Sequence, residues 1–307
     1  MPTRASRCAL ILVLCLFCGC HLTGPPWSPP PGHLTLNLWL HRAPGAPFIA
    51  LPEANQTTSQ DELVAGKPVV RLHHVTTPTL TLYMPAANNT GAAIVVMPGG
   101  GYQFLVPDLE GTEVCDWLSS VGINCILLKY RVPRSGPYPT YSAALQDAQR
   151  TMGIVRSHAV EWHIDPHRVG VLGFSAAANL AAALGSHFDH RLYDPVDAAD
   201  NLSCRPDFTI LMYPGYMTVK DQPALPNPDV LPIAGTPPTL IVQAEDDRIG
   251  VENSITAFLA LKRAGVPTEL HIYAEGGHGY GLRPNGLPVS TWPHMVETWL
   301  HTIHILR

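Results

Sequence analysis

Ser, Asp and His each follow an apolar segment of this chain. Together, these three residue types can activate a hydroxyl for attack on a carbonyl. Ser175 lies in Gly173-Phe174-Ser175-Ala176-Ala177, after the apolar run 168–172 and before the Ala-rich stretch 176–184. The short β-branched run predicts a buried strand, and the Ala/Leu stretch predicts a helix. A serine on the sharp turn between them has the geometry of a nucleophile elbow, where the helix N-terminus favours a developing negative charge.

Two carboxylates and a histidine follow Ser175 in the order that this arrangement requires. Asp246 and Asp247 come after the apolar segment 237–244, and the glycine-flanked His278 comes after an alternating segment. Open α/β sheets place their ligand crevice beyond the carboxyl ends of the strands, where we expect these side chains. A serine hydroxyl needs a neutral imidazole to accept its proton, and the imidazole needs a carboxylate to orient it. The residues therefore predict a catalytic triad with one of the two aspartates as its acid.

A glycine-rich segment, Pro98-Gly99-Gly100-Gly101-Tyr102, follows the buried strand that we predict for residues 93–97. Consecutive glycines expose backbone N–H groups without side chains in the way. We expect the N–H groups of Gly100, Gly101 and Ala176 to form an oxyanion hole. The segment lacks the Gly-x-Gly-x-x-Gly spacing and has no Lys-Ser/Thr pair after it, which argues against a nucleotide site.

Five segments, in order, resemble α/β-hydrolase esterases of the branch related to hormone-sensitive lipase, near bacterial acetylxylan-esterase-like proteins. The resemblance covers roughly residues 70–307 and is specific because the segments keep the family's order. They are the glycine segment 98–102, the segment 129–148 with its Tyr-Arg-Val-Pro and Leu-Gln-Asp-Ala motifs, the serine segment 173–180, the acid loop 246–252 and the histidine loop 276–279.

That resemblance implies a serine carboxylesterase that hydrolyses short-chain acyl esters, including acetyl esters on polysaccharide, without a cofactor or a metal. It implies Ser175 as the nucleophile and His278 as the base. The spacing to the Val-Pro pair of the family's acid loop favours Asp246 over Asp247 as the acid. Pro98 stands where the family has its oxyanion histidine, and Ala177 where it has a glycine, although alanine is small enough for the elbow to survive.

Two other functions stay open on the sequence. A serine peptidase of the prolyl-oligopeptidase kind shares the fold and the triad, and the triple glycine argues against it. A non-catalytic binding protein on a hydrolase scaffold is the second, and it predicts an incomplete triad, whereas Ser, Asp and His are all present.

The order of predicted strands and helices favours one α/β domain with a doubly wound, mostly parallel sheet and helices on both faces. The Pro-rich loop 213–235 is too short for a large cap domain, so we expect an open site, over which residues 33–68 could lean. Charged residues make up 14% of the 307 residues, and the net charge is −5 with no basic cluster. This balance argues against a nucleic-acid partner and leaves a small-molecule or polysaccharide ester as the expected partner.

The N-terminus has the pattern of a targeting segment. Arg4 and Arg7 precede an apolar stretch from Ala9 to Phe17, and Gly19-Cys20 follows it. This order predicts a signal peptide of lipoprotein type, residues 1–20, with Cys20 as the lipidated residue; ordinary secretion and an uncleaved anchor are the alternatives. We expect a Pro-rich tether over residues 21–47 and the hydrolase domain over 48–307. The protein would then be exported, periplasmic or at the cell surface, and would contact the membrane only through the lipid.

Three of the seven cysteines, Cys115, Cys125 and Cys204, lie outside the targeting segment. An odd number cannot pair fully, and each has an apolar or helical context. We therefore expect buried structural thiols rather than metal ligands or a disulfide framework, and no His/Cys spacing indicates zinc.

Overall fold

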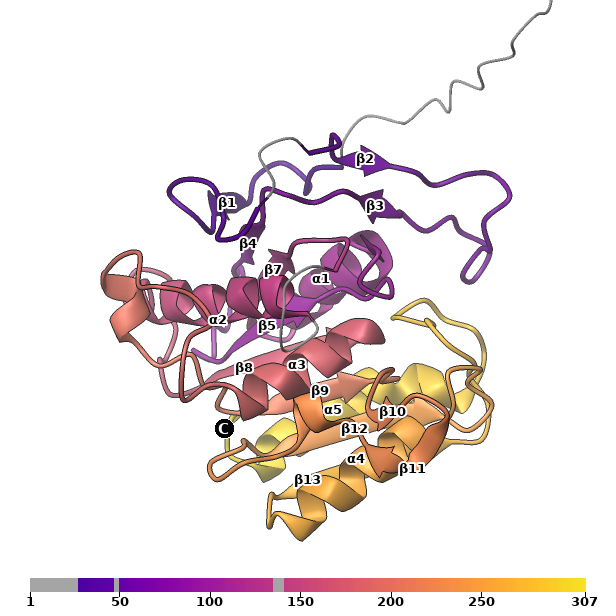
Figure 1. Cartoon of the computed structure of the whole chain (residues 1–307). Coiled ribbons are helices and arrows are strands. Elements are labelled where there is room, and N and C mark those ends of the chain that lie inside the picture. The colour runs from indigo at the N-terminus through magenta and orange to yellow at the C-terminus, as the bar shows by residue number, and fades with distance from the viewer. Residues whose placement is uncertain (1–26, 47–49, 135–140) are drawn as a thin grey trace, which may run out of the picture.

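A computed structural model describes residues 27–46, 50–134 and 141–307, which fold around one large sheet (Figure 1). The sheet has eight strands in the order β1-β4-β7-β5-β8-β9-β12-β13. Neighbours from β7 to β13 are parallel, whereas β4 is antiparallel to both β1 and β7. The strands are Leu34–Asn37 (β1), Thr79–Tyr83 (β4), Ala93–Met97 (β5), Asn124–Lys129 (β7), Val169–Phe174 (β8), Thr209–Met212 (β9), Thr239–Ala244 (β12) and Thr268–Tyr273 (β13).

Helices cover both faces of the sheet because successive strand residues point to opposite sides. In β5, Ala93, Val95 and Met97 pack with three helices on one face, and Ile94 and Val96 pack with two helices on the other. The first face carries Ser142–Ser157 (α2), Ala176–Ser186 (α3) and Glu252–Arg263 (α4), and the second carries Glu113–Ser120 (α1) and Trp292–Thr302 (α5). The predicted doubly wound α/β fold is confirmed.

Two small sheets lie beside the main one. A three-stranded sheet joins Ala54–Asn55 (β2), Leu72–His73 (β3) and Phe104–Leu105 (β6), and a hairpin joins Thr218–Val219 (β10) to Gln222–Pro226 (β11). Four short helical turns complete the described elements: Asp108–Thr112 (η1), Ala198–Asn201 (η2), Pro228–Val230 (η3) and Pro288–Thr291 (η4). The loop predicted for residues 213–235 therefore contains ordered structure. The long helix predicted from Tyr141 to Trp162 is shorter, because α2 ends at Ser157 and a series of turns follows.

Part of the predicted tether is built into the domain. Strand β1 pairs with β4, so residues 34–37 form the edge of the main sheet. The buried Trp39 donates from Nε1 to Oδ1 of Asp147 at 2.9 Å, and Asp147 also pairs with Arg131. The boundary predicted at residue 48 is therefore wrong, because the segment before it supplies a strand and a core side chain. The predicted signal peptide and Cys20 lie outside the described residues.

Within residues 27–46, 50–134 and 141–307, none of the helices has the length and apolarity that crossing a membrane requires.

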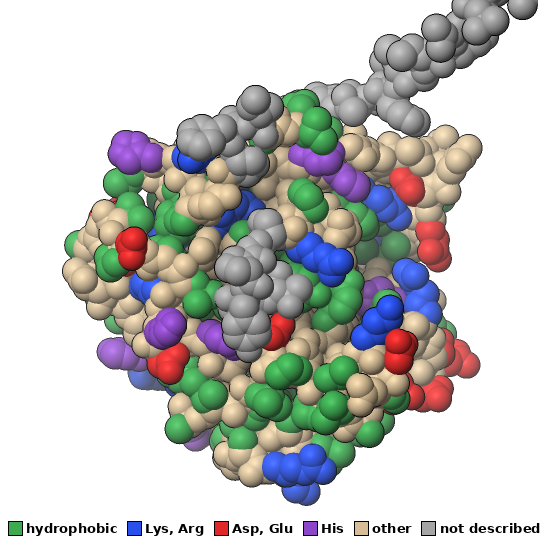
Figure 2. All heavy atoms as spheres, in the orientation of Figure 1, with side chains coloured by type: hydrophobic (Ala, Val, Ile, Leu, Met, Phe, Trp, Pro, Cys, Tyr) green, Lys and Arg blue, Asp and Glu red, His purple; other side chains and the backbone are tan. Residues whose placement is uncertain are grey.

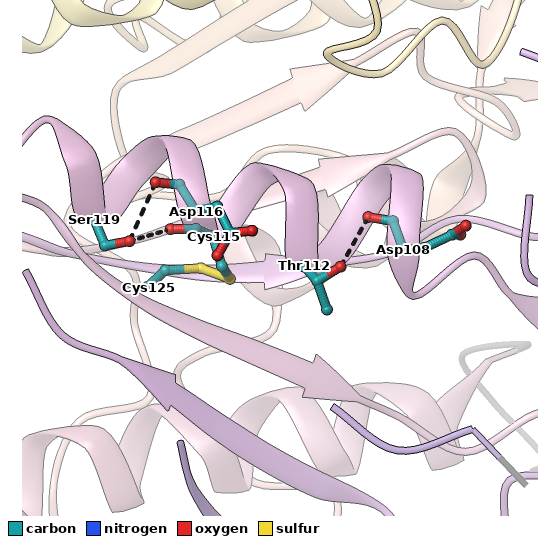
Figure 3. Close-up of a disulfide and its surroundings, with 6 residues drawn as sticks. All are labelled: Asp108, Thr112, Cys115, Asp116, Ser119 and Cys125. Carbon is teal, nitrogen blue, oxygen red and sulfur yellow. Dashed lines mark hydrogen bonds between the residues drawn. A yellow bond between two sulfur atoms is a disulfide. The ribbon is translucent and has the colours of Figure 1, made fainter. Parts of the chain in front are cut away.

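A disulfide joins Cys115 of α1 to Cys125 of β7 (Figure 3). The two Cα atoms are 5.1 Å apart because α1 packs directly against β7, and both side chains are fully buried. The expectation of free thiols is wrong for this pair, because the sequence separation of the two cysteines does not reveal that the helix packs against the strand. Cys204 is a buried free thiol, as expected.

We predict that replacing Cys115 and Cys125 together by Ala lowers the free energy of unfolding by roughly 2–3 kcal/mol, because the cross-link restricts the unfolded chain. Urea denaturation of the wild type with and without dithiothreitol should show the same drop, and the double variant should not respond to the reductant. Cys204→Ala is the control and should keep the response. A wild-type midpoint that is insensitive to full reduction of the pair would contradict the prediction.

Candidate active site

Ser175 occupies a strained turn between β8 and α3. Its φ of 53° and ψ of −116° lie outside the regions that residues with a Cβ ordinarily adopt. The turn is possible because its neighbours are small: a Cβ on Gly173 would lie 2.1 Å from the carbonyl oxygen of Ala177. Ala177 is fully buried at the position where the related motif has glycine, so alanine does permit the elbow. The backbone thus presents the Ser175 hydroxyl at the carboxyl end of the sheet.

A continuous hydrogen-bonded chain runs from Ser175 through His278 to Asp247. Ser175 Oγ lies 2.8 Å from His278 Nε2, and His278 Nδ1 lies 2.8 Å from Asp247 Oδ2. Ser175 follows β8, Asp247 follows β12 and His278 follows β13, so three strand ends supply the three groups. Such a chain lets the imidazole take a proton from the serine while the carboxylate fixes the tautomer.

Asp246, the acid favoured by the sequence, does not contact His278. Its side chain is exposed, and Oδ1 accepts hydrogen bonds from the N–H groups of Gly276 at 3.0 Å and Gly277 at 2.7 Å. The assignment of Asp246 as the acid is therefore wrong. The turn after β12 directs Asp247 into the protein and Asp246 outward, and a one-residue difference in a loop cannot be settled from spacing alone. Asp246 instead holds the loop that carries His278.

Asp247 is held as a carboxylate by its surroundings. Burial alone would raise its pKa, but the hydrogen bond and the charge of His278, together with hydrogen bonds from Ile249 and Gln243, outweigh it and lower the pKa below the ordinary value. These last two hydrogen bonds come from the N–H of Ile249 at 2.8 Å and from Nε2 of Gln243 at 3.0 Å. An ionised Asp247 can therefore stabilise a positive imidazole as the serine proton is transferred.

The glycine segment after β5 lies at the same cleft. Gly100 has a φ of 127°, and a Cβ there would lie 2.1 Å from the carbonyl oxygen of Phe104, so no other residue fits. Gly100 and Gly101 line the cleft with Ser175, and Ala176 begins α3 directly after the serine. Within the described part of the chain, the N–H groups of Gly100, Gly101 and Ala176 donate to no other residue. They are thus available for an oxygen of a bound substrate.

Sequence reasoning missed a buried glutamate beneath this segment. Glu110, in η1, accepts from the Gly99 N–H at 2.7 Å and from the Tyr213 hydroxyl at 2.9 Å. The ring of Tyr213 lies edge-on to His278, with centroids 5.1 Å apart. Burial raises the pKa of Glu110 against the opposing effect of these hydrogen bonds. Glu110 therefore links the glycine segment to the ring that packs on His278, and no motif signals it because the link spans distant elements.

The cleft around Ser175 has a volume of about 780 Å³. Glu62 and Val64 line it, so part of the segment 33–68 does lean over the site, as expected. Figure 2 shows Lys and Arg side chains spread over this face, several of them on its right-hand side. The basic residues that line the cleft are Arg71, Arg134, Lys220 and Arg248. Among the described residues no three His, Cys, Asp or Glu side chains are grouped so as to hold a metal ion.

Comparisons with known proteins agree with this fold. Residues 94–230 match a family model described as the alpha/beta hydrolase fold. An acetylxylan esterase of Xylanibacter ruminicola is 31% identical over 218 residues, which are 64% of this chain and 42% of that protein. Carboxylesterase NlhH of Mycobacterium tuberculosis is 27% identical over 66% of this chain and 70% of its own. The chain thus spans about two fifths of the length of the first of these relatives.

A solved structure extends the match to nearly a whole protein. The crystal structure of an acetyl ester-xyloside bifunctional hydrolase from Caldicellulosiruptor lactoaceticus superposes with a TM-score of 0.70 at 32% identity. The match covers 89% of this chain and 97% of that one. The elbow at Ser175, the parallel sheet and these likenesses together show that the chain belongs to the α/β-hydrolase family.

Proposed function

We propose that the protein is a serine carboxylesterase in which Ser175, His278 and Asp247 form the catalytic triad. The observation that carries the proposal is the unbroken chain of two 2.8 Å contacts that joins the three side chains. His278 takes the proton of the Ser175 hydroxyl as its oxygen bonds to the ester carbonyl carbon. The same imidazole then gives that proton to the departing alcohol.

The oxyanion of the tetrahedral intermediate is bound by the N–H groups of Gly100, Gly101 and Ala176. Support comes from their lack of partners among the described residues and from their position beside Ser175. Donors that are already fixed need no reorganisation when the charge develops. Glu110 fixes the preceding residue, Gly99, and so holds the segment in place. In the second half of the reaction, water activated by His278 cleaves the acyl-enzyme and frees Ser175.

The substrate of this proposal is a short-chain ester, with acetyl esters on a polysaccharide as the natural class. Two similar proteins are named for acetyl esters of xylan or xylosides, which supports the acetyl group and the sugar. Charged side chains such as Arg134, Lys220 and Arg248 lie among the apolar residues that line the cleft, which supports the short chain. A long acyl tail would need an apolar tunnel in place of these groups, since burial of each methylene stabilises by about 0.8 kcal/mol.

The proposal includes export and a lipid anchor at Cys20. Its basis is the order of basic residues, apolar stretch and Gly19-Cys20 in the sequence, which lies outside the described residues. The disulfide between Cys115 and Cys125 supports export, because disulfides persist in oxidising compartments. The membrane contact in this proposal is the lipid alone.

The first test replaces the nucleophile. We expect Ser175→Ala to lower kcat for p-nitrophenyl acetate on the order of 10⁴-fold or more, because the acyl-enzyme cannot form. Thermal unfolding should stay cooperative, since the hydroxyl is not part of the core. Ser203→Ala, an exposed serine outside the cleft, is the matched control and should leave kcat unchanged. Activity of Ser175→Ala within about tenfold of the wild type would contradict a mechanism in which Ser175 is the nucleophile.

The two neighbouring aspartates give the second test. Asp247→Asn should lower kcat by on the order of 10³–10⁴-fold, because an amide stabilises the wrong tautomer of His278. Asp246→Asn should keep kcat within about tenfold of the wild type, because the amide oxygen can still accept from the Gly276 and Gly277 N–H groups. Steady-state kinetics on p-nitrophenyl acetate measure both variants, and the reverse ranking would return the acid role to Asp246.

Acyl chain length gives the third test. The wild type should hydrolyse acetyl and butyryl p-nitrophenyl esters with a higher kcat/KM than the decanoyl ester, because a broad cleft with charged side chains among its apolar ones does not enclose a long chain as an apolar tunnel would. The comparison is made below the critical micelle concentration of each ester. A preference for the decanoyl ester would refute the short-chain assignment while leaving the triad untouched.

A further inference from the structure

An aromatic side chain stands exposed beside the catalytic serine. Tyr216 lies between β9 and β10, is 42% exposed, and lines the same cleft as Ser175 and His278. A Cβ built on Gly101 would have the Tyr216 hydroxyl oxygen as its nearest neighbour, at 3.7 Å. The phenol hydroxyl therefore lies beside the glycine segment, in the cleft that also holds Ser175.

The ring is backed by two further tyrosines. The rings of Tyr102 and Tyr141 are stacked, with centroids 3.8 Å apart and planes 13° apart. Their centroids lie 6.1 Å and 5.9 Å from that of Tyr216, within the range of interacting aromatic pairs. Tyr102 is fully buried, and its hydroxyl donates to Oδ1 of Asn179 at 2.9 Å. Of these three tyrosines, Tyr102 is held in the core, and Tyr141 and Tyr216 line the cleft.

The backbone of Tyr216 is held in a conformation that tyrosine rarely adopts. Its φ is 59°, in the left-handed region that disfavours residues with bulky side chains. The carbonyl oxygen of Tyr216 accepts from Nδ2 of Asn179 at 2.9 Å and from Nδ2 of Asn227 at 2.8 Å. The N–H of the preceding Gly215 donates to the carbonyl of Ser175 at 3.2 Å. Backbone strain that persists under several restraints is typical of functional positions.

We propose that the exposed face of Tyr216, with Tyr141 beside it, is a subsite that stacks on a pyranose ring of the alcohol part of the ester. The inference rests on the proposed esterase function and adds the residues that hold the sugar. A pyranose presents a face of electropositive C–H groups, which the negative face of an aromatic ring attracts. Arg134 and Lys220 line the same cleft and offer donors to the hydroxyl groups at the edge of such a ring.

The chemistry of this surface separates a sugar from other alcohols. An aromatic face in a cleft that also carries cationic donors is complementary to a polyol, which has apolar faces and polar edges. A long alkyl alcohol would leave the donors unpaired, and desolvated donors without partners lower affinity. A small alcohol such as ethanol has neither a ring face to stack on Tyr216 nor further hydroxyl groups to pair with the donors. The subsite therefore acts on binding of large alcohols and not on the chemistry at Ser175.

The test compares two esters that share the acetyl group and differ in the alcohol. Tyr216→Ala should lower kcat/KM for an acetylated xylo-oligosaccharide about tenfold, mostly through KM, while ethyl acetate changes less than about twofold. Tyr216→Phe keeps the ring and should behave as the wild type on both. Leu225→Ala, an equally exposed residue of the β10–β11 hairpin outside the cleft, is the control and should change neither. Retained hydrolysis of ethyl acetate shows that each variant is folded.

Three results would overturn the proposal, and they differ in which other claims they contradict. An unchanged ratio of the two kcat/KM values in Tyr216→Ala would contradict the sugar subsite and nothing else. An equal loss on both esters would place Tyr216 at the reacting centre instead of the alcohol. A wild type that hydrolyses ethyl acetate but not the acetylated oligosaccharide would remove both the polysaccharide substrate and the pyranose subsite, and would leave the esterase chemistry intact.

Discussion

The backbone of Ser175 is the constraint on which the rest of the site depends. Its φ of 53° turns the chain from β8 into α3 within one residue, and this turn requires small residues at Gly173 and Ala177, two positions to either side. The carbonyl oxygen of Ala177 takes the place where a side chain on Gly173 would lie. Strain of this kind persists only where the surrounding structure fixes it. The parallel sheet and the buried start of α3 restrain this backbone, so the fold itself holds the serine hydroxyl in position.

Two sets of contacts connect this turn to the other strand ends. One is the chain through His278 to Asp247, which joins β8 to the loops after β13 and β12. The other runs from the glycine segment through Glu110 to Tyr213, whose ring packs against His278. In the mechanism that we propose, these contacts therefore link the donors for the substrate oxygen to the base for the serine proton. Asp246 adds a third contact by holding the backbone before His278.

The sequence predicted those parts of the site that local pattern determines. Ser175 and His278 lie at the ends of segments whose periodicity indicates strands, and their order along the chain restricts the fold. The choice between Asp246 and Asp247 depends on how a loop turns, and that turn is set by contacts of Asp247 with Gln243 and Ile249. The disulfide of Cys115 with Cys125, the edge strand β1 and the exposed Tyr216 depend on packing between elements, which periodicity does not encode.

The central claim is that Ser175 is a nucleophile activated by His278, and an active-site-directed fluorophosphonate tests it most directly. A nucleophilic serine displaces fluoride and becomes a stable phosphonyl ester, whereas an unactivated surface hydroxyl does not react at a comparable rate. Peptide mapping by mass spectrometry after labelling should find one modified residue, Ser175, with loss of ester hydrolysis in proportion to labelling. A protein that stays unlabelled while folded, or one labelled at another serine with full loss of activity, would contradict the claim.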